Sequence, residues 1–292
     1  MIPRFRSRNG WSMHHAIVAV VMGAMGVLAT WDAWQDIARI AMKDEESSHI
    51  FLVPIVMGWL MWIRRRRLRQ CRPGGGSVGV LIAAAGWFCY SFGDARLYQS
   101  LWHGGAVLVV LGCILSVLGR DVFFQFLPAF ATLIFAVPVP GRLRQQIAIP
   151  LGAATAQITE RVLDFFGVAV ERSGNLLTIN KVDVAIAEAC NGLRMVFALT
   201  LVSFAFALGT PLRGYARILV LAASPVSAIV CNVIRLIPTL LVYGNYPADT
   251  AEFFHDISGW VMLPISFLIL MSILRLLRWA LVPVTRYTLA YD

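Results

Sequence analysis

The sequence predicts an all-α polytopic membrane protein of about eight transmembrane helices, with one amphipathic interfacial helix and a small β-hairpin. Of its 292 residues, 59% are hydrophobic and only 14% are charged. A soluble domain is about half apolar and about a quarter charged. The apolar residues form long runs, and the segments between these runs are too short to fold as soluble domains. A single transmembrane domain over residues 1–292 is therefore expected.

The basic residues and the cysteines narrow the class of protein further. The net charge of +9 would suit nucleic acid, but the basic residues lie between apolar runs, as topology signals and lipid headgroup contacts do. Membrane lipids are therefore expected partners and nucleic acid is not. The five cysteines form no CxxC pair, and three of them lie inside apolar runs. This pattern argues against a disulfide framework or a zinc site, and no metal or cofactor is expected.

The first half of the chain alternates between apolar runs and charged turns. Arginines precede the run 16–30, which predicts an uncleaved first helix with a cytoplasmic N-terminus. The polar, acidic segment 32–48 suits the outer face. The run 50–63 returns inward and ends at four consecutive arginines, residues 64–67, the strongest cytoplasmic mark in the sequence. Three more crossings follow, at 78–92, 101–118 and 122–137.

Two segments in the middle of the chain do not look like spans. Residues 142–166 mix apolar side chains with glutamines and charges, which predicts an amphipathic helix at the outer surface or packed across the bundle. Arg142 and Arg144 would then lie outside, against the usual charge bias. Residues 168–187 alternate with period two around Asn180 and Lys181, which predicts a hairpin. An unpaired strand cannot lie in hydrocarbon, so this hairpin should be extramembrane or covered by protein.

Three further crossings complete the predicted topology, with both ends of the chain in the cytoplasm. They cover residues 195–208, 218–243 and 257–277. An outer loop at 244–252 joins the last two.

A cysteine lies where the hairpin leads into the run that begins at Met195. One helical turn separates Cys190 from Arg194, and a guanidinium beside a thiol favours the thiolate. The alternative is a small buried cysteine whose neighbouring arginine only extends to the lipid headgroups.

Two more polar groups share the predicted outer side with Cys190. Asn232 and Arg235 are three residues apart and project from one helix face, with Arg235 about 12 Å below the outer end of its run. A charge at that depth should face the bundle interior, either for function or to bind carbonyls or an acid on another helix. His255, two residues before the last run, could be an interfacial residue or the base for a thiol nucleophile.

The ordered set of motifs resembles the exosortase/archaeosortase family over roughly residues 44–278. The matching pieces are Glu188-Ala189-Cys190-Asn191-Gly192-Leu193-Arg194, Asn232-Val233-Ile234-Arg235 and His255, with an earlier echo in Ser48-His49-Ile50-Phe51-Leu52-Val53-Pro54. The family more often has serine after the cysteine, and Asn191 departs from that pattern.

The resemblance implies a multi-pass cysteine protease/transpeptidase of the bacterial inner membrane, of the PEP-CTERM protein-sorting type. It would cleave the C-terminal sorting signal of secreted proteins at the outer face. Its partners would be proteins that end in a short motif, a transmembrane helix and a basic tail. Cys190 would be the nucleophile, with Arg235 and His255 completing the catalytic group. The supporting or substrate-binding positions would be Glu188, Asn191, Arg194 and Asn232.

Two other functions compete with this one. A transporter would also contain a buried arginine, but the sequence shows no internal repeat and no pair of broken helices in matching halves. A lipid-modifying acyltransferase could use the same thiol on a different acyl donor.

Overall fold

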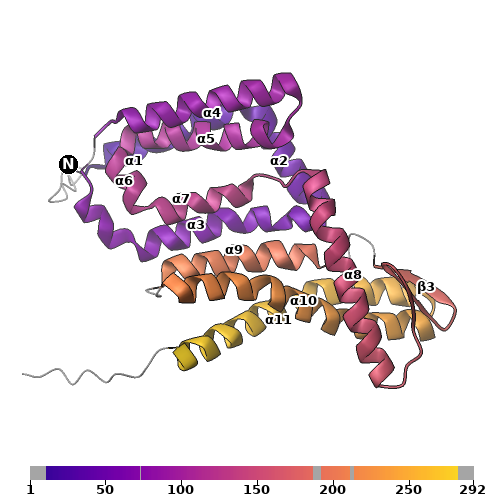
Figure 1. Cartoon of the computed structure of the whole chain (residues 1–292). Coiled ribbons are helices and arrows are strands. Elements are labelled where there is room, and N and C mark those ends of the chain that lie inside the picture. The colour runs from indigo at the N-terminus through magenta and orange to yellow at the C-terminus, as the bar shows by residue number, and fades with distance from the viewer. Residues whose placement is uncertain (1–10, 73, 187–191, 211–213, 282–292) are drawn as a thin grey trace, which may run out of the picture. The chain divides into compact units, whose positions relative to one another are not determined.

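The computed structural model describes residues 11–72, 74–186, 192–210 and 214–281 (Figure 1). They form helices and one small sheet, in two compact units, Met1–Ile147 and Ala148–Asp292. The first unit contains α1 (Met13–Ala29), α2 (Trp31–Lys43), η1 (Glu45–Phe51), α3 (Leu52–Ile63), η2 (Arg65–Gln70), α4 (Ser77–Arg96), α5 (Gln99–Leu118), α6 (Arg120–Gln125), α7 (Leu127–Ala131) and η3 (Thr132–Ala136). Helix α8 (Gly141–Phe165) continues across the boundary between the units.

Glycines at intervals of seven residues bring α4 and α5 together as an antiparallel pair. They are Gly79, Gly86 and Gly93 on α4, and Gly105 and Gly112 on α5. A Cβ at any of these positions would collide with the backbone of the other helix. Without a hydrophobic driving force in lipid, such close backbone approach is what helix pairing in membranes uses. The two helices lie side by side in Figure 1.

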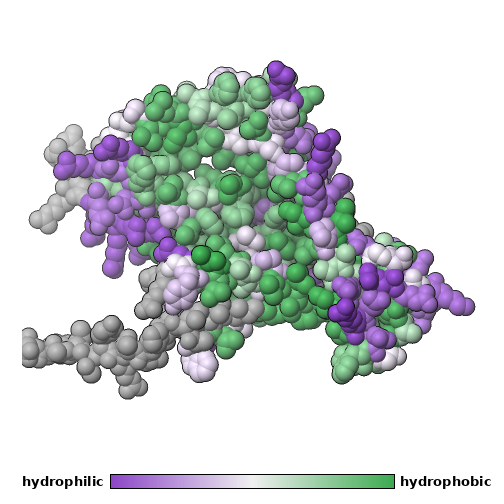
Figure 2. All heavy atoms as spheres, viewed as in Figure 1, coloured by the Kyte–Doolittle hydropathy of each residue, from purple (hydrophilic) through white to green (hydrophobic). Residues whose placement is uncertain are grey.

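Hydrogen bonds between side chains and the main chain hold together the end of the first unit that carries the arginine run. Trp11 donates its indole N–H to the carbonyl of Cys71 at 3.0 Å, and the Arg72 N–H donates to the Asp121 carboxylate at 3.3 Å. Burial and the nearby Asp121 charge raise the pKa of the Cys71 thiol. Hydrophilic atoms gather where α3 connects to α4 (Figure 2), whereas the faces of α4 and α5 are hydrophobic. This pattern fits a charged membrane rim beside a lipid-facing surface.

Two segments of the first unit differ from the predicted pattern. The acidic segment after the first run is largely helical, since α2 covers Trp31–Lys43 and turns by 83° from α1. Its buried residues Ala33, Ile37 and Ala41 lie one turn apart on one face, as in a helix that lies along an interface. The predicted crossing 122–137 is broken into α6, α7 and η3, with Pro128 in the first turn of α7.

The second unit contains β1 (Glu171–Ser173), β2 (Leu176–Ile179), β3 (Val182–Ala185), α9 (Leu193–Gly209), α10 (Gly214–Asn245) and α11 (Ala248–Leu281). The predicted amphipathic segment is the single helix α8. The predicted hairpin is β2–β3, whose turn residues Asn180 and Lys181 have φ of 50° and 66°. The sheet has a third strand, β1, paired antiparallel with β2.

The sheet covers the C-terminal part of α10. The buried side chains of Leu177, Val184 and Ile186 pack with Leu236 and Leu240 of that helix. The Asn180 side chain donates to the Gly244 carbonyl at 3.1 Å, near the end of α10. Figure 2 shows hydrophilic residues over the sheet. The sheet is thus covered by protein on one face, which agrees with the prediction that it is extramembrane or covered by protein.

Among the described residues, length and composition identify four helices that can cross a membrane, or up to six if each bent pair is one span. The four are Glu46–Ile63, Ser77–Arg96, Gln99–Leu118 and Gly214–Asn245, and two shorter apolar helices are Leu127–Ala136 and Leu193–Gly209. The all-helical polytopic class is confirmed. The number of eight spans stays a prediction.

The connection between the last two helices is shorter than predicted. Only Tyr246 and Pro247 separate α10 from α11, because the first residues of the predicted loop 244–252 continue α10 and the last begin α11. His255 therefore lies inside α11 rather than before the last helix. The helix changes direction by 44° between Gly259 and Pro264.

Candidate active site

Arg235 and His255 meet in the second unit. The Nη2 of Arg235 lies 3.0 Å from Nε2 of His255, and it also donates to the carbonyl of His255 at 3.3 Å. Arg235 is 8% exposed although it carries a permanent charge. A buried charge is stable only when its donors are satisfied. Residues of α11 accept hydrogen bonds from the guanidinium and so satisfy these donors.

Chemistry assigns the proton on the His255 ring. A guanidinium only donates hydrogen bonds, so Nε2 of His255 must accept through its lone pair. The other ring nitrogen, Nδ1, lies 3.2 Å from the carboxylate of Asp256 and can donate to it. This arrangement is a neutral imidazole protonated on Nδ1. The carboxylate holds the ring as an orienting group holds a catalytic base.

Ser258 and Gly259 complete the surroundings of the guanidinium. Nε of Arg235 donates to the Ser258 hydroxyl at 3.2 Å, and this hydroxyl donates to the His255 carbonyl at 2.8 Å. Gly259 lies against the guanidinium, since a Cβ there would sit 3.4 Å from Nη2. Sequence reasoning missed both residues. Their signal was the spacing, because positions three and four after His255 share its helix face.

Asn232 lies one turn earlier on α10 and packs against Gly192. Asn232 is 1% exposed. Gly192 has φ of 79°, and a Cβ there would come within 3.0–3.1 Å of the Asn232 side chain. Arg194 is the second residue of α9, and its charge and that of Arg235 repel each other. Two positive charges therefore act on one region of the unit.

The remaining predicted site residues, Glu188, Cys190 and Asn191, lie outside the described residues. The structure thus brings Arg235 and His255 into contact and places Asn232 and Arg194 nearby.

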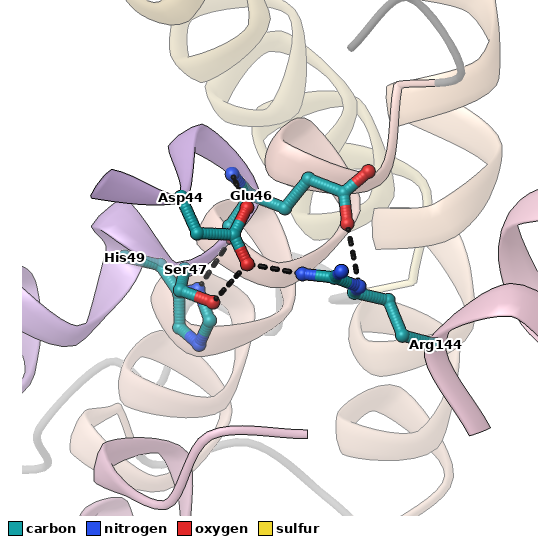
Figure 3. Close-up of polar contacts among 5 residues, drawn as sticks. All are labelled: Asp44, Glu46, Ser47, His49 and Arg144. Atoms are coloured by element: carbon teal, nitrogen blue, oxygen red, sulfur yellow. Dashed lines mark hydrogen bonds and ion pairs between the residues drawn. The ribbon is translucent and has the colours of Figure 1, made fainter. Parts of the chain in front are cut away.

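A second polar cluster lies in the first unit, where η1 meets the start of α8 (Figure 3). Arg144 forms an ion pair with Asp44 and a second one with Glu46, at 3.3 Å. The Ser47 hydroxyl donates to Asp44 at 3.1 Å, and Nδ1 of His49 donates to the Glu46 carbonyl at 3.0 Å. Sequence reasoning singled out Arg144 only as an exception to the charge bias.

Comparison with known proteins identifies the family. The search of curated proteins found no match, and neither did the search of solved structures. The family model described as transmembrane exosortase (Exosortase_EpsH) matches residues 34–272, which include α3, α10 and all of the Arg235–His255 site. This chain belongs to the transmembrane exosortase family.

Proposed function

We propose that the protein is a membrane cysteine protease/transpeptidase that cleaves the C-terminal sorting signal of secreted proteins at the outer face of the bacterial inner membrane. Cys190 would be the nucleophile, with Arg235 and His255 as its catalytic partners. The observation that carries the proposal is the 3.0 Å contact between guanidinium and imidazole, in a member of a family of membrane proteins that act in protein sorting.

Chain geometry supports Cys190 as the third member. Ile186 packs on Leu236 and Leu240, and Gly192 packs on Asn232. Asn232 and Leu236 are one turn apart on α10, and Arg235 lies between them. Two peptide units separate Cys190 from Gly192, so their Cα atoms are at most about 7.6 Å apart. Arg235 is thus close to both attachment points of the segment that contains the thiol.

The first chemical step forms an acyl-enzyme. The Cys190 thiolate attacks the scissile carbonyl, and the peptide C–N bond breaks to release the transmembrane helix with its basic tail. Nε2 of His255 takes the thiol proton and later gives it to the leaving amine. For this, the hydrogen bond from Arg235 to Nε2 must open. The released guanidinium can then donate to the oxyanion.

The second step resolves the thioester. Water would give simple cleavage, and an amine on a lipid or glycan would give transfer. Both partners diffuse in the membrane plane, so a weak intrinsic affinity for the sorting motif is sufficient.

Single substitutions test the proposal in cells that express a reporter with a motif, helix and basic tail. Cys190→Ala, Arg235→Ala and His255→Ala should each abolish reporter processing while the protein stays in the membrane. Cys231→Ala is the matched control, because this buried thiol lies in a separate apolar cluster with Met195 and Met262 and should be dispensable. Full processing by Cys190→Ala would refute the thiol mechanism.

The trapped intermediate separates this function from its competitors. Mass spectrometry of the Cys190 adduct should show a peptidyl group. A fatty acyl group would instead identify a lipid-modifying acyltransferase. A transporter would keep its activity without the thiol.

A further inference from the structure

Strand β3 has an open edge. Ile179 and Val182 flank the two-residue turn, so they form the first hydrogen-bonded pair of the hairpin. Hydrogen-bonded pairs then alternate along the strands, and the N–H of Ile186 accordingly donates to the Asn175 carbonyl at 2.8 Å. Asp183 and Ala185 lie between these positions. Their N–H and C=O groups must point away from β2.

The outward groups of Asp183 and Ala185 are available for pairing. Both residues are exposed, and within the described part of the chain no backbone hydrogen bond is formed by their outward groups. The Asp183 side chain is already held, since it accepts from the Thr178 hydroxyl at 2.7 Å. An open edge of this kind offers two donors and two acceptors to any extended polypeptide.

The edge is also close to the candidate active site. The inward side chains Val184 and Ile186 pack on Leu236 and Leu240, the residues of α10 that follow Arg235. Figure 1 shows β3 near the end of α10. In sequence, Cys190 comes four residues after Ile186.

We infer that the outer edge of β3 binds the backbone of the substrate polypeptide next to its scissile bond, as a fourth strand paired with Asp183 and Ala185. The inference rests on the proposed function, because that function supplies an extended peptide at this face. Main-chain pairing is independent of side chains, so specificity must come from elsewhere in the site.

A second copy of the chain is a poorer occupant. The strand Val182–Ala185 is only four residues long, and pairing two such edges buries far less than the roughly 1,000 Å² that a stable interface needs. A substrate held in the same membrane needs little affinity, because its local concentration is high.

A proline at position 185 tests the edge without breaking the β2–β3 ladder. Ala185→Pro removes the outward N–H, and proline is tolerated where an edge N–H faces solvent. Ala185→Val is the matched control, since it keeps the N–H and suits a strand. With the purified protein and a reporter peptide, Ala185→Pro should lower kcat/KM about 3- to 10-fold relative to Ala185→Val. The loss should lie mainly in KM.

Photo-crosslinking gives a second readout that does not depend on proline. A photoreactive residue in place of Asp183 should crosslink to the reporter, whereas one in place of Arg172, on the opposite edge of the sheet, should not. Crosslinks between two copies of the enzyme in place of reporter adducts would overturn the inference.

The two proposals fail in different ways. Equal kcat/KM for Ala185→Pro and Ala185→Val, in a protein that Cys190→Ala inactivates, overturns the substrate edge and leaves the thiol mechanism intact. Activity of Cys190→Ala overturns the thiol mechanism instead.

Discussion

The buried guanidinium of Arg235 shows what the sequence reveals about a single residue. Its depth in a long apolar run indicates that it faces protein, and the structure gives it three hydrogen bonds to α11 and no carboxylate among the described residues. These three contacts of Arg235 therefore do not include the acidic side chain on another helix that the sequence left open as a partner. Bonds to a carbonyl, a hydroxyl and an imidazole engage the guanidinium donors without removing its positive charge, which suits a group that stabilises an anion during reaction.

At Gly192, both the backbone conformation and the packing against Asn232 disfavour a side chain. Any side chain there pays the cost of the left-handed region, about 1–2 kcal/mol, and also meets Asn232 at 3.0–3.1 Å. We expect Gly192→Ala to reduce processing about tenfold or more, because a shift of about 1 Å near a reacting group is enough for such a loss. Reporter processing and membrane levels of the protein measure this effect.

Gly174→Ala is the control for backbone strain alone. Gly174 has φ of 63° in the β1–β2 turn, and a Cβ there would meet nothing within 4 Å. This variant should process the reporter nearly as the unchanged protein does. If both variants lose activity equally, the contact with Asn232 is unimportant.

At the scale of elements, the ion cluster of Figure 3 explains an exception to the charge rule. Arg144 would be on the outer side of the membrane, where arginines are disfavoured. Asp44 and Glu46 neutralise it locally, with the Glu46 side chain only 7% exposed and that of Arg144 25% exposed. The cluster fixes the start of α8 to η1, the segment that leads into α3.

Charge reversal tests this attachment. Arg144→Glu leaves the carboxylates of Asp44 and Glu46 without a cation and places a third carboxylate beside them. We expect the free energy of unfolding to fall by about 1–3 kcal/mol or more. The loss would be measured as a lower melting temperature in detergent. Adding Asp44→Arg should recover part of the loss. Arg142→Glu changes an exposed residue of the same helix turn and should have little effect. No recovery in the double variant would show that the cluster acts through packing rather than charge.

The strands and helices also show which elements sequence patterns can predict and which they cannot. Alternating apolar residues predicted β2 and β3, but β1 consists of Glu171, Arg172 and Ser173, all exposed, and carries no pattern to detect. The start of α11 was placed too late because Asp249, Glu252 and Asp256 interrupt the apolar residues there, and a helix can extend beyond the apolar run that would span the membrane. The contact between Arg235 and His255 could be predicted because both residues were expected on the same side of the membrane. The role of Ser258 could not, because it depends on His255 lying inside α11, on the same helix face as Ser258.

At the scale of the whole molecule, the charge pattern predicts sidedness. We expect the arginine run after α3 and the basic residues after α9 to lie in the cytoplasm, with the chain reaching the outer side between them. The family membership agrees with a multi-pass protein. Helix α8 leads directly into the sheet of the second unit. This one helix determines on which side the sheet and the Arg235–His255 site lie.

Single cysteines at three exposed positions decide the question, in a variant whose five native cysteines are replaced. Arg142→Cys precedes α8, Lys181→Cys lies in the β2–β3 turn, and Arg66→Cys lies in the arginine run. We expect a membrane-impermeant maleimide to label positions 142 and 181 in intact spheroplasts, and position 66 only after permeabilisation. Native Cys71 would contribute little labelling even if it were kept, because its burial and raised pKa make its thiol a poor nucleophile. Labelling of position 142 without position 181 would mean that α8 crosses the membrane. The candidate site would then open to the cytoplasm, where a secreted substrate could not reach it after export.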